Sequence, residues 1–155
     1  MKKLLLSLMT FTLSLLGVHA ATADFNQVLP LPQTITPGKG KAFELGQQTP
    51  LFVAAADRET LKNESAFLAE FVEQLTGIHL ATVEKVERKT PTIVLAIDPK
   101  IQGRETYRLT VTERQLTISA STSAGIFYGI QTLRKALPVI DGTETISIPA
   151  TVVTD

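Results

Sequence analysis

Apolar residues recur at helical spacing in two parts of the chain. Across residues 58–76 the apolar side chains fall close to one stripe of a helix, and Gly77 stands where a C-terminal cap is expected. A second stripe follows Thr122 or Ser123, either of which could cap a helix, and stops at Pro138. The pattern therefore predicts two helices. The apolar positions are Leu61, Leu68, Phe71, Val72 and Leu75 in the first and Ile126, Ile130, Leu133 and Leu137 in the second.

Continuous and alternating apolar stretches predict the strands. Residues 92–97 are a continuous apolar run, which is typical of a strand buried on both faces inside a sheet. Residues 107–111 and 116–120 alternate apolar and polar positions on either side of a turn at 113–115, which predicts an antiparallel hairpin with one buried face. Shorter apolar stretches predict three further strands, at 42–45, 50–54 and 145–148.

Gly125 and Gly129 lie four residues apart in the second predicted helix. Glycine costs about 1 kcal/mol relative to alanine in a helix interior, so the pair predicts a surface that a neighbouring element approaches closely. The order of strands, helix, strand, hairpin, helix and strand indicates an α+β domain, with two helices packed on one face of a mainly antiparallel sheet. We expect the glycines to lie against that sheet.

The first 23 residues resemble a signal peptide. Two lysines precede an apolar run over residues 4–18, which is shorter than the ~20 residues of a membrane-spanning helix. Small residues allow cleavage after Ala20 or after Ala23, and the second site is favoured; a membrane anchor is the weaker alternative. We expect export from a bacterial cell, to the periplasm, the outer surface or the medium, with no stable membrane span.

The mature segment is predicted to begin with an extended arm over residues 24–32. The prolines of Leu29-Pro30-Leu31-Pro32 favour an extended chain over a helix here. The Gly-Lys-Gly at residues 38–40 lacks the spacing and the Ser/Thr ending of a phosphate-binding loop, so it is interpreted as a turn.

Composition narrows the function classes. The chain has 155 residues, 44% of them hydrophobic and 19% charged, which suits one globular domain. Without its first 23 residues it keeps 13 Lys and Arg against 15 Asp and Glu, so nucleic acid is a poor partner. The absence of cysteine excludes disulfides, a thiolate metal site and a cysteine nucleophile.

Few side chains offer catalytic chemistry. His79 is the only histidine outside the signal segment, so it cannot build a three-histidine zinc site, and we expect it on the surface or in a loop. Folding could bring together the carboxylates of Asp57, Glu59, Glu105 and Asp141, but their surroundings predict turns and surface strands. We therefore predict no catalytic residue, no cofactor-binding residue and no metal ligand.

Two further motifs have ordinary explanations. Tyr107 and Tyr128 could form a platform for sugar stacking, but a buried strand face and a helix close to the sheet favour structural roles for them. Asn63-Glu64-Ser65 matches a glycosylation sequon, but it lies in a predicted helix behind a bacterial-type signal, so we interpret it as a chance match.

Three stretches together resemble a known family. They are Glu-Thr-Tyr-Arg-Leu-Thr-Val at 105–111, Leu-Thr-Ile-Ser-Ala at 116–120 and Gly-Ile-Phe-Tyr-Gly-Ile-Gln-Thr-Leu at 125–133. With Val-Leu-Pro-Leu-Pro at 28–32, they resemble the N-terminal domain of family 20 glycoside hydrolases, the β-N-acetylhexosaminidases. The resemblance spans nearly all of residues 26–155, and the helix motif is its most specific part.

The resemblance implies a non-catalytic domain that supports a (β/α)₈ barrel of the same polypeptide. It places the domain at residues 24–150 and the start of the linker to the barrel at 151–155. The family's substrate-assisted hydrolysis implies an adjacent Asp-Glu pair in the barrel, and this chain contains no Asp-Glu dipeptide. The implied parent is an exported enzyme that removes terminal N-acetylhexosamine from glycans.

Two alternatives stay open at this point. The chain could be a free-standing carbohydrate-binding module or adhesin that docks a glycan directly. It could also be the equivalent domain of another glycosidase family, such as the O-GlcNAc hydrolase-like enzymes or the α-glucuronidases.

Overall fold

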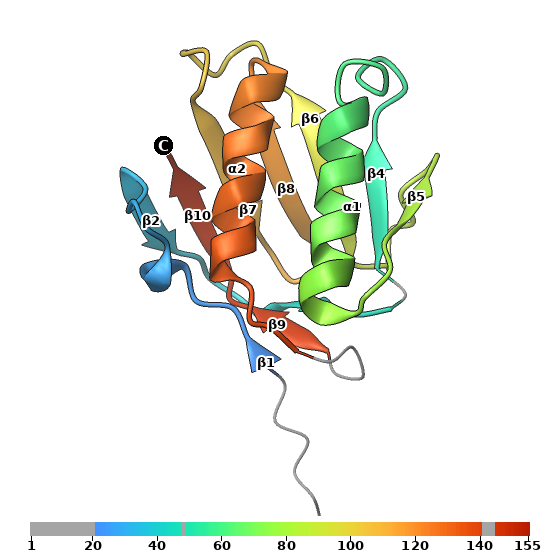
Figure 1. Ribbon diagram of the computed structural model, residues 1–155, viewed down its shortest axis with the longest axis vertical. Helices are drawn as coiled ribbons and strands as arrows, with labels where there is room; N and C mark the ends of the chain where they lie inside the picture. Colours follow the sequence, from blue (N-terminus) through green and yellow to red (C-terminus); the bar gives the residue numbers. More distant parts are fainter. Residues whose placement is uncertain (1–20, 48, 141–144) are drawn as a thin grey trace, which may run out of the picture.

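The domain has two layers, helices on a sheet. The computed structural model describes residues 21–47, 49–140 and 145–155. Both helices lie side by side on one face of a seven-stranded sheet, and a three-stranded sheet lies at one end of the molecule (Figure 1). The α+β class and the placement of both helices on one face are therefore confirmed.

The elements follow one another along the described residues in a strand-rich order. They are β1 (Ala21–Thr22), η1 (Phe25–Gln27), β2 (Thr34–Pro37), β3 (Phe43–Leu45), β4 (Pro50–Val53), α1 (Lys62–Thr76), β5 (Ala81–Val83), β6 (Thr92–Ile97), β7 (Tyr107–Val111), β8 (Gln115–Ala120), α2 (Ser123–Ala136), β9 (Ile146–Ile148) and β10 (Thr151–Thr154).

The large sheet is mixed rather than mainly antiparallel. Its strand order is β2-β10-β7-β8-β6-β4-β5. The pairs from β2 to β8 are antiparallel, whereas β8, β6, β4 and β5 pair in parallel. Helix α1 carries the chain back along the sheet between β4 and β5, as a parallel connection requires. Alternating hydrophobicity reveals the buried face of a strand but not its direction, so the parallel half was missed.

The predicted hairpin and the predicted inner strand are both confirmed. In the hairpin Leu109 of β7 stands opposite Ile118 of β8, and both side chains are fully buried. Strand β6 lies between β4 and β8, where Leu95 continues the same row beside Ile118. The row packs under the helices and forms the centre of the core.

The predicted capping residues are found at the end of α1 and at the beginning of α2. Gly77 adopts a left-handed conformation with φ of 65°, and its N–H donates to the Glu73 carbonyl. Helix α1 begins at Lys62 rather than at residue 58, because residues 55–61 form turns. Thr122 caps α2, since its Oγ1 accepts the Gly125 N–H at 3.2 Å.

The glycine pair of α2 lies directly on the sheet, as predicted. A Cβ atom at Gly125 would come within 2.6 Å of the Ala120 Cβ and of the Thr106 carbonyl oxygen. One at Gly129 would lie 2.5 Å from the Ile118 Cγ2. Both distances are far below van der Waals contact, so only glycine lets the helix approach this closely.

The last residues of the chain belong to the sheet. Residues 151–155 were predicted to start a linker, but 151–154 form β10, which pairs with β2 on one side and β7 on the other. Val153 is fully buried in the core. The linker prediction came from resemblance alone, and the alternation of buried and half-buried positions along Thr-Val-Val-Thr becomes visible only in the structure.

The arm before β2 is less extended than predicted. Asp24 caps the 3₁₀ turn η1, because its Oδ1 accepts the Asn26 N–H at 2.9 Å. This hydrogen bond and one from the Gln27 side chain lower the pKa of the Asp24 carboxyl. The proline-rich part that follows then leads into β2.

The first described residues are also part of the fold. Ala21 and Thr22 pair in parallel with β9, and the N–H of buried Ala23 donates to the Ser147 carbonyl at 3.0 Å. The segment predicted as a signal peptide lies mostly outside the described residues, in 1–20. Within the described part of the chain, no helix is both long enough and apolar enough to cross a bilayer.

Candidate functional site

The carboxylates considered from the sequence belong to separate segments. Asp57 and Glu59 lie in the turns before α1, where the Asp57 Oδ2 accepts the Ile97 N–H at 3.2 Å. Glu105 is exposed in the loop before β7, and Asp141 lies outside the described residues. Over residues 21–47, 49–140 and 145–155, no three His, Asp or Glu side chains gather as metal ligands would.

His79 and the sequon lie on the surface. His79 follows α1 and is exposed, as predicted, with its Nδ1 3.6 Å from the Glu73 Oε2. Asn63 and its two neighbours lie in the first turns of α1.

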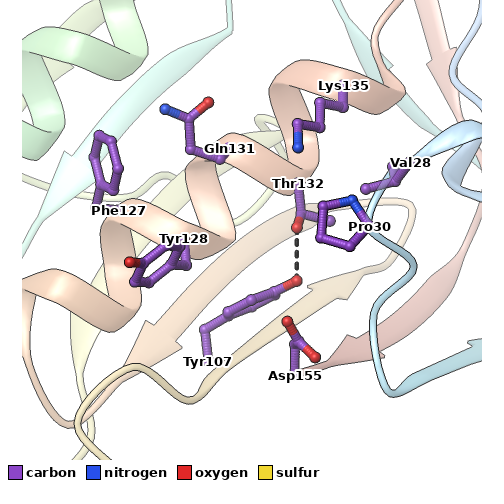
Figure 2. A pocket seen from close by; sticks show the side chains of 9 residues that line it. All are labelled: Val28, Pro30, Tyr107, Phe127, Tyr128, Gln131, Thr132, Lys135 and Asp155. Atoms are coloured by element: carbon purple, nitrogen blue, oxygen red, sulfur yellow. Dashed lines mark hydrogen bonds between the residues drawn. The ribbon is translucent and has the colours of Figure 1, made fainter.

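A surface hollow of about 320 Å³ lies between α2, the arm and the end of β10 (Figure 2). A neighbouring hollow of about 300 Å³ shares Tyr128 and Asp155 with it. We take the two hollows together as the candidate site. The larger is lined by Val28, Pro30, Tyr107, Phe127, Tyr128, Gln131, Thr132, Lys135 and Asp155, and the smaller also by Gln33, Glu105 and Thr106.

Tyr107 forms the floor of the larger hollow. Its ring is 2% exposed, and its hydroxyl lies 2.6 Å from the Thr132 Oγ1 of α2 (Figure 2). The missing side chain of Gly129 makes room for the ring, because a Cβ there would lie 3.1 Å from Tyr107 Cδ2. Burial raises the pKa of the Tyr107 hydroxyl, and the charge of Asp155 raises it further, whereas the hydrogen bond with Thr132 acts in the opposite direction.

Asp155 and Lys135 fasten the arm to the rest of the domain. The Asp155 Oδ1 accepts the Gln33 N–H at 3.1 Å, and the Asp155 backbone exchanges two hydrogen bonds with Tyr107, of 2.9 and 3.3 Å. On the other side of the hollow, the Lys135 ammonium donates to the Leu29 carbonyl. The arm is thus held by β10 and by α2 at once.

Tyr128 differs from the prediction. It was expected to have a structural role on a helix packed close to the sheet, but it is 44% exposed and lines both hollows. Its ring centroid lies 5.9 Å from that of Phe127, which is also exposed. Neither aromatic lies on the Ile126–Leu133 stripe, and apolar residues off the stripe are the signal that could have revealed this surface.

The carboxylates that line the candidate site are exposed. Most glycosidases use a carboxylic acid whose pKa is raised by its surroundings, next to a second carboxylate that stays ionised. Glu105 and Asp155 both line the smaller hollow, but both are exposed to solvent. Tyr107, with its raised pKa, stays protonated at neutral pH and cannot serve as a base.

Tyr107→Phe is expected to flatten the loss of stability at alkaline pH. The folded-state pKa of Tyr107 lies above its ordinary value of 10.0. The stability that the protonated hydroxyl contributes to the fold is therefore fully present below pH 10 and is lost as the pH rises through the folded-state pKa. The variant should also lose about 1 kcal/mol at pH 7 because the Thr132 hydroxyl loses its partner. Urea unfolding between pH 7 and 11 measures both effects, and parallel profiles for the two proteins would contradict the argument.

Known proteins match this sequence and fold. The family profile described as glycosyl hydrolase family 20, domain 2, matches residues 26–155. A curated β-hexosaminidase from Porphyromonas gingivalis is 28% identical over 127 residues, which make up 81% of this chain and 16% of that protein. The chain thus spans about a sixth of that relative's length.

Solved structures of β-N-acetylhexosaminidases match the fold of this chain. The GH20 β-N-acetylhexosaminidase from Streptomyces coelicolor A3(2) matches with a TM-score of 0.71 and 25% identity, over 85% of this chain and 26% of that chain. The N-acetyl-β-hexosaminidase from Streptomyces plicatus matches with a TM-score of 0.67 and 27% identity, over 84% and 26% of the two chains. The profile match over most of the sequence and the agreement in fold show that this chain belongs to glycosyl hydrolase family 20, as its domain 2.

Proposed function

We propose that this chain is a non-catalytic support domain of a bacterial, exported β-N-acetylhexosaminidase that removes terminal N-acetylhexosamine from glycans. The observation that carries the proposal is the family match over residues 26–155. The chain covers only 26% of the Streptomyces coelicolor enzyme and 26% of the Streptomyces plicatus enzyme, so most of each enzyme lies outside the matching part. The exposed carboxylates of the candidate site support a separate catalytic domain, a (β/α)₈ barrel in the same polypeptide.

The packing of the domain suits a rigid support. Helix α2 is fixed to the sheet by glycine contacts and by the hydrogen bond between Tyr107 and Thr132. The arm is tied to α2 through Lys135 and to β10 through Asp155. A surface held at both edges can present a neighbouring domain in one orientation.

An assay with p-nitrophenyl N-acetylglucosaminide tests the proposal. The complete natural reading frame containing this sequence should hydrolyse the substrate, whereas residues 21–155 alone should release no product above buffer. Glu105→Gln in the complete enzyme should leave the turnover unchanged, since that carboxylate has no catalytic role. Turnover by residues 21–155, or a hundredfold loss in Glu105→Gln, would contradict the proposal.

The isolated domain also separates this function from that of a carbohydrate-binding module. Calorimetric titration of residues 21–155 with N-acetylglucosamine oligomers should give no saturable heat for a support domain. Saturable binding would favour the module.

We further propose that the signal peptide ends at Ala20 rather than Ala23. Pairing of Ala21 and Thr22 with β9 supports this, together with the burial of Ala23, because cleavage after Ala23 would remove all three residues from the fold. Mass spectrometry of the protein exported from a bacterial host should show an N-terminus at Ala21. A mature chain that starts at Asp24 would contradict the expectation.

A further inference from the structure

A third hollow, of about 330 Å³, lies where the loop between β6 and β7 meets the end of β10. Its size is at the lower end of the range of ligand pockets, about 300–1,000 Å³. We call it the cationic hollow, and the polar side chains that line it are those of Asp98, Lys100, Gln102, Thr106, Arg108 and Thr154.

The sheet fixes the position of Arg108. Along β7 it alternates with buried Tyr107 and Leu109, so its side chain leaves the sheet on the face that the helices do not cover. Thr154 of β10 and Ser119 of β8 stand directly opposite it in the two neighbouring strands. Because β7 is paired on both sides, the base of the Arg108 side chain is held firmly.

The loop that carries Lys100 is held in shape by hydrogen bonds. The Asp98 Oδ1 accepts the Lys100 N–H at 3.0 Å, and the Asp98 N–H donates to the Ala120 carbonyl at 2.8 Å. Further along the loop, the Ser121 hydroxyl donates to the Gly103 carbonyl at 2.9 Å. A site whose backbone is already fixed loses little entropy when a ligand binds.

The cationic hollow carries an excess of positive charge. In the part of the chain that the structure describes, neither the Lys100 ammonium nor the Arg108 guanidinium takes part in an ion pair. Among the lining residues Asp98 alone is acidic, and its carboxylate already accepts a backbone N–H. An arginine fork matches an oxyanion with two parallel hydrogen bonds, so the free guanidinium favours an anionic ligand.

Charge also separates this hollow from its neighbour. The smaller hollow of the candidate site shares Thr106 with it, but is lined by the carboxylates of Glu105 and Asp155 and, among the described residues, by no Lys or Arg. An anion is therefore repelled on one side of Thr106 and attracted on the other. Tyr107 also lines the cationic hollow, but at 2% exposure its ring offers no face on which a neutral sugar could stack.

We propose that the cationic hollow binds the oxyanion of an acidic glycan, which is a sulfate ester or a carboxylate on a sugar ring. The Arg108 guanidinium donates paired hydrogen bonds to the oxyanion, and the Lys100 ammonium neutralises its charge. That a glycan carries the oxyanion rests on the proposed function. The site keeps an acidic glycan at the enzyme and takes no part in hydrolysis.

Titration of the complete protein with matched sugars tests the proposal. The probes lack an acetamido group, so that a catalytic site for N-acetylhexosamine does not take them. Methyl β-glucuronide is compared with neutral methyl β-glucoside, galactose 6-sulfate with galactose, and inorganic sulfate serves as the free ion. Saturation-transfer NMR at low ionic strength measures each affinity. In at least one pair the acidic sugar should bind about tenfold more tightly than the neutral one, and more tightly than inorganic sulfate.

Three substitutions locate the binding. Arg108→Gln should weaken binding of the acidic sugar about tenfold, and Arg108→Lys should give a smaller loss because it keeps the charge without the fork. Lys39→Gln removes one charge from the exposed turn after β2 and should change the affinity less than about twofold, since surface charges are screened at a distance. Equal losses for Arg108→Gln and Lys39→Gln would overturn the site, because net charge alone would then explain the binding.

The p-nitrophenyl N-acetylglucosaminide assay on the same preparations keeps this inference apart from the proposed function. All three variants should keep full activity, which also shows that they are folded. An active enzyme that binds acidic and neutral sugars equally, or inorganic sulfate as tightly as either acidic sugar, would leave the proposed function standing and overturn the acidic-glycan site. An inactive protein that binds acidic sugars through Arg108 would support the site and contradict the proposed function.

Discussion

Gly129→Leu is expected to destabilise the domain by about 3 kcal/mol or more. Even the first atom of the new side chain would lie 2.5 Å from the Ile118 Cγ2 and 3.1 Å from the ring of Tyr107. Overpacking of a filled core costs about 1–3 kcal/mol and sometimes more, and here α2 must move away from the sheet. Leucine is a better helix former than glycine by up to about 1 kcal/mol, so the measured loss already includes an opposing gain. Urea unfolding followed by circular dichroism measures the difference.

Arg134→Leu is the matched control for this substitution. Arg134 is exposed on the same helix, so a leucine there meets no neighbour from the sheet. Its stability should stay within about 0.5 kcal/mol of the unchanged protein, as for most surface substitutions. Similar losses at positions 129 and 134 would show that leucine disturbs the helix itself and that the close packing of Gly129 is irrelevant.

Removal of residues 151–155 is expected to cost more than about 3 kcal/mol and to prevent stable folding at physiological temperature. The truncation removes fully buried Val153, whose burial contributes about 1.5–3 kcal/mol. It also breaks two strand pairings, with β2 and with β7, at about 1 kcal/mol for each lost hydrogen bond. Thermal unfolding of residues 21–150 and 21–155 compares the two proteins, and equal midpoints would restore the prediction that this segment is a linker.

A matched pair of substitutions tests the same strand without truncation. Val153→Thr places a hydroxyl in the core and should lose about 1–3 kcal/mol. Val152→Thr makes the same chemical change at a half-buried position and should lose less than about 0.5 kcal/mol. Equal losses would mean that β10 does not present Val153 to the core.

The parts of the fold predicted from sequence are those with strong local patterns. Helix α2 has a capping threonine, a regular stripe and a terminating proline, and its residues match the structure. The glycine pair also predicted its own packing, because glycine inside a helix needs a reason that only a close neighbour supplies. The hairpin of β7 and β8 was found because its alternation covers both strands.

The parts that were missed depend on partners far away in the chain. Strands β1, β2, β5 and β10 have two to four residues each, which is too short for a periodic signal, and their pairing supplies the evidence that their sequence lacks. The parallel direction of β4 and β6 likewise follows from topology. Among the side chains of the candidate site, Tyr107 was located correctly, but the approach of Asp155 to the arm depends on a pairing that sequence alone did not show.

The position of β10 has a consequence for the biosynthesis of the protein. Thr151 donates to the carbonyl of Thr36, 115 positions earlier, and β10 separates β2 from the rest of the large sheet. While the ribosome is still making residues before 151, β2 has no place in that sheet, and its unpaired edge offers hydrogen-bonding groups to other chains. Contacts between such distant residues slow folding, so this domain stays incompletely folded until β10 has left the ribosome. The large sheet can therefore close only after synthesis has passed β10.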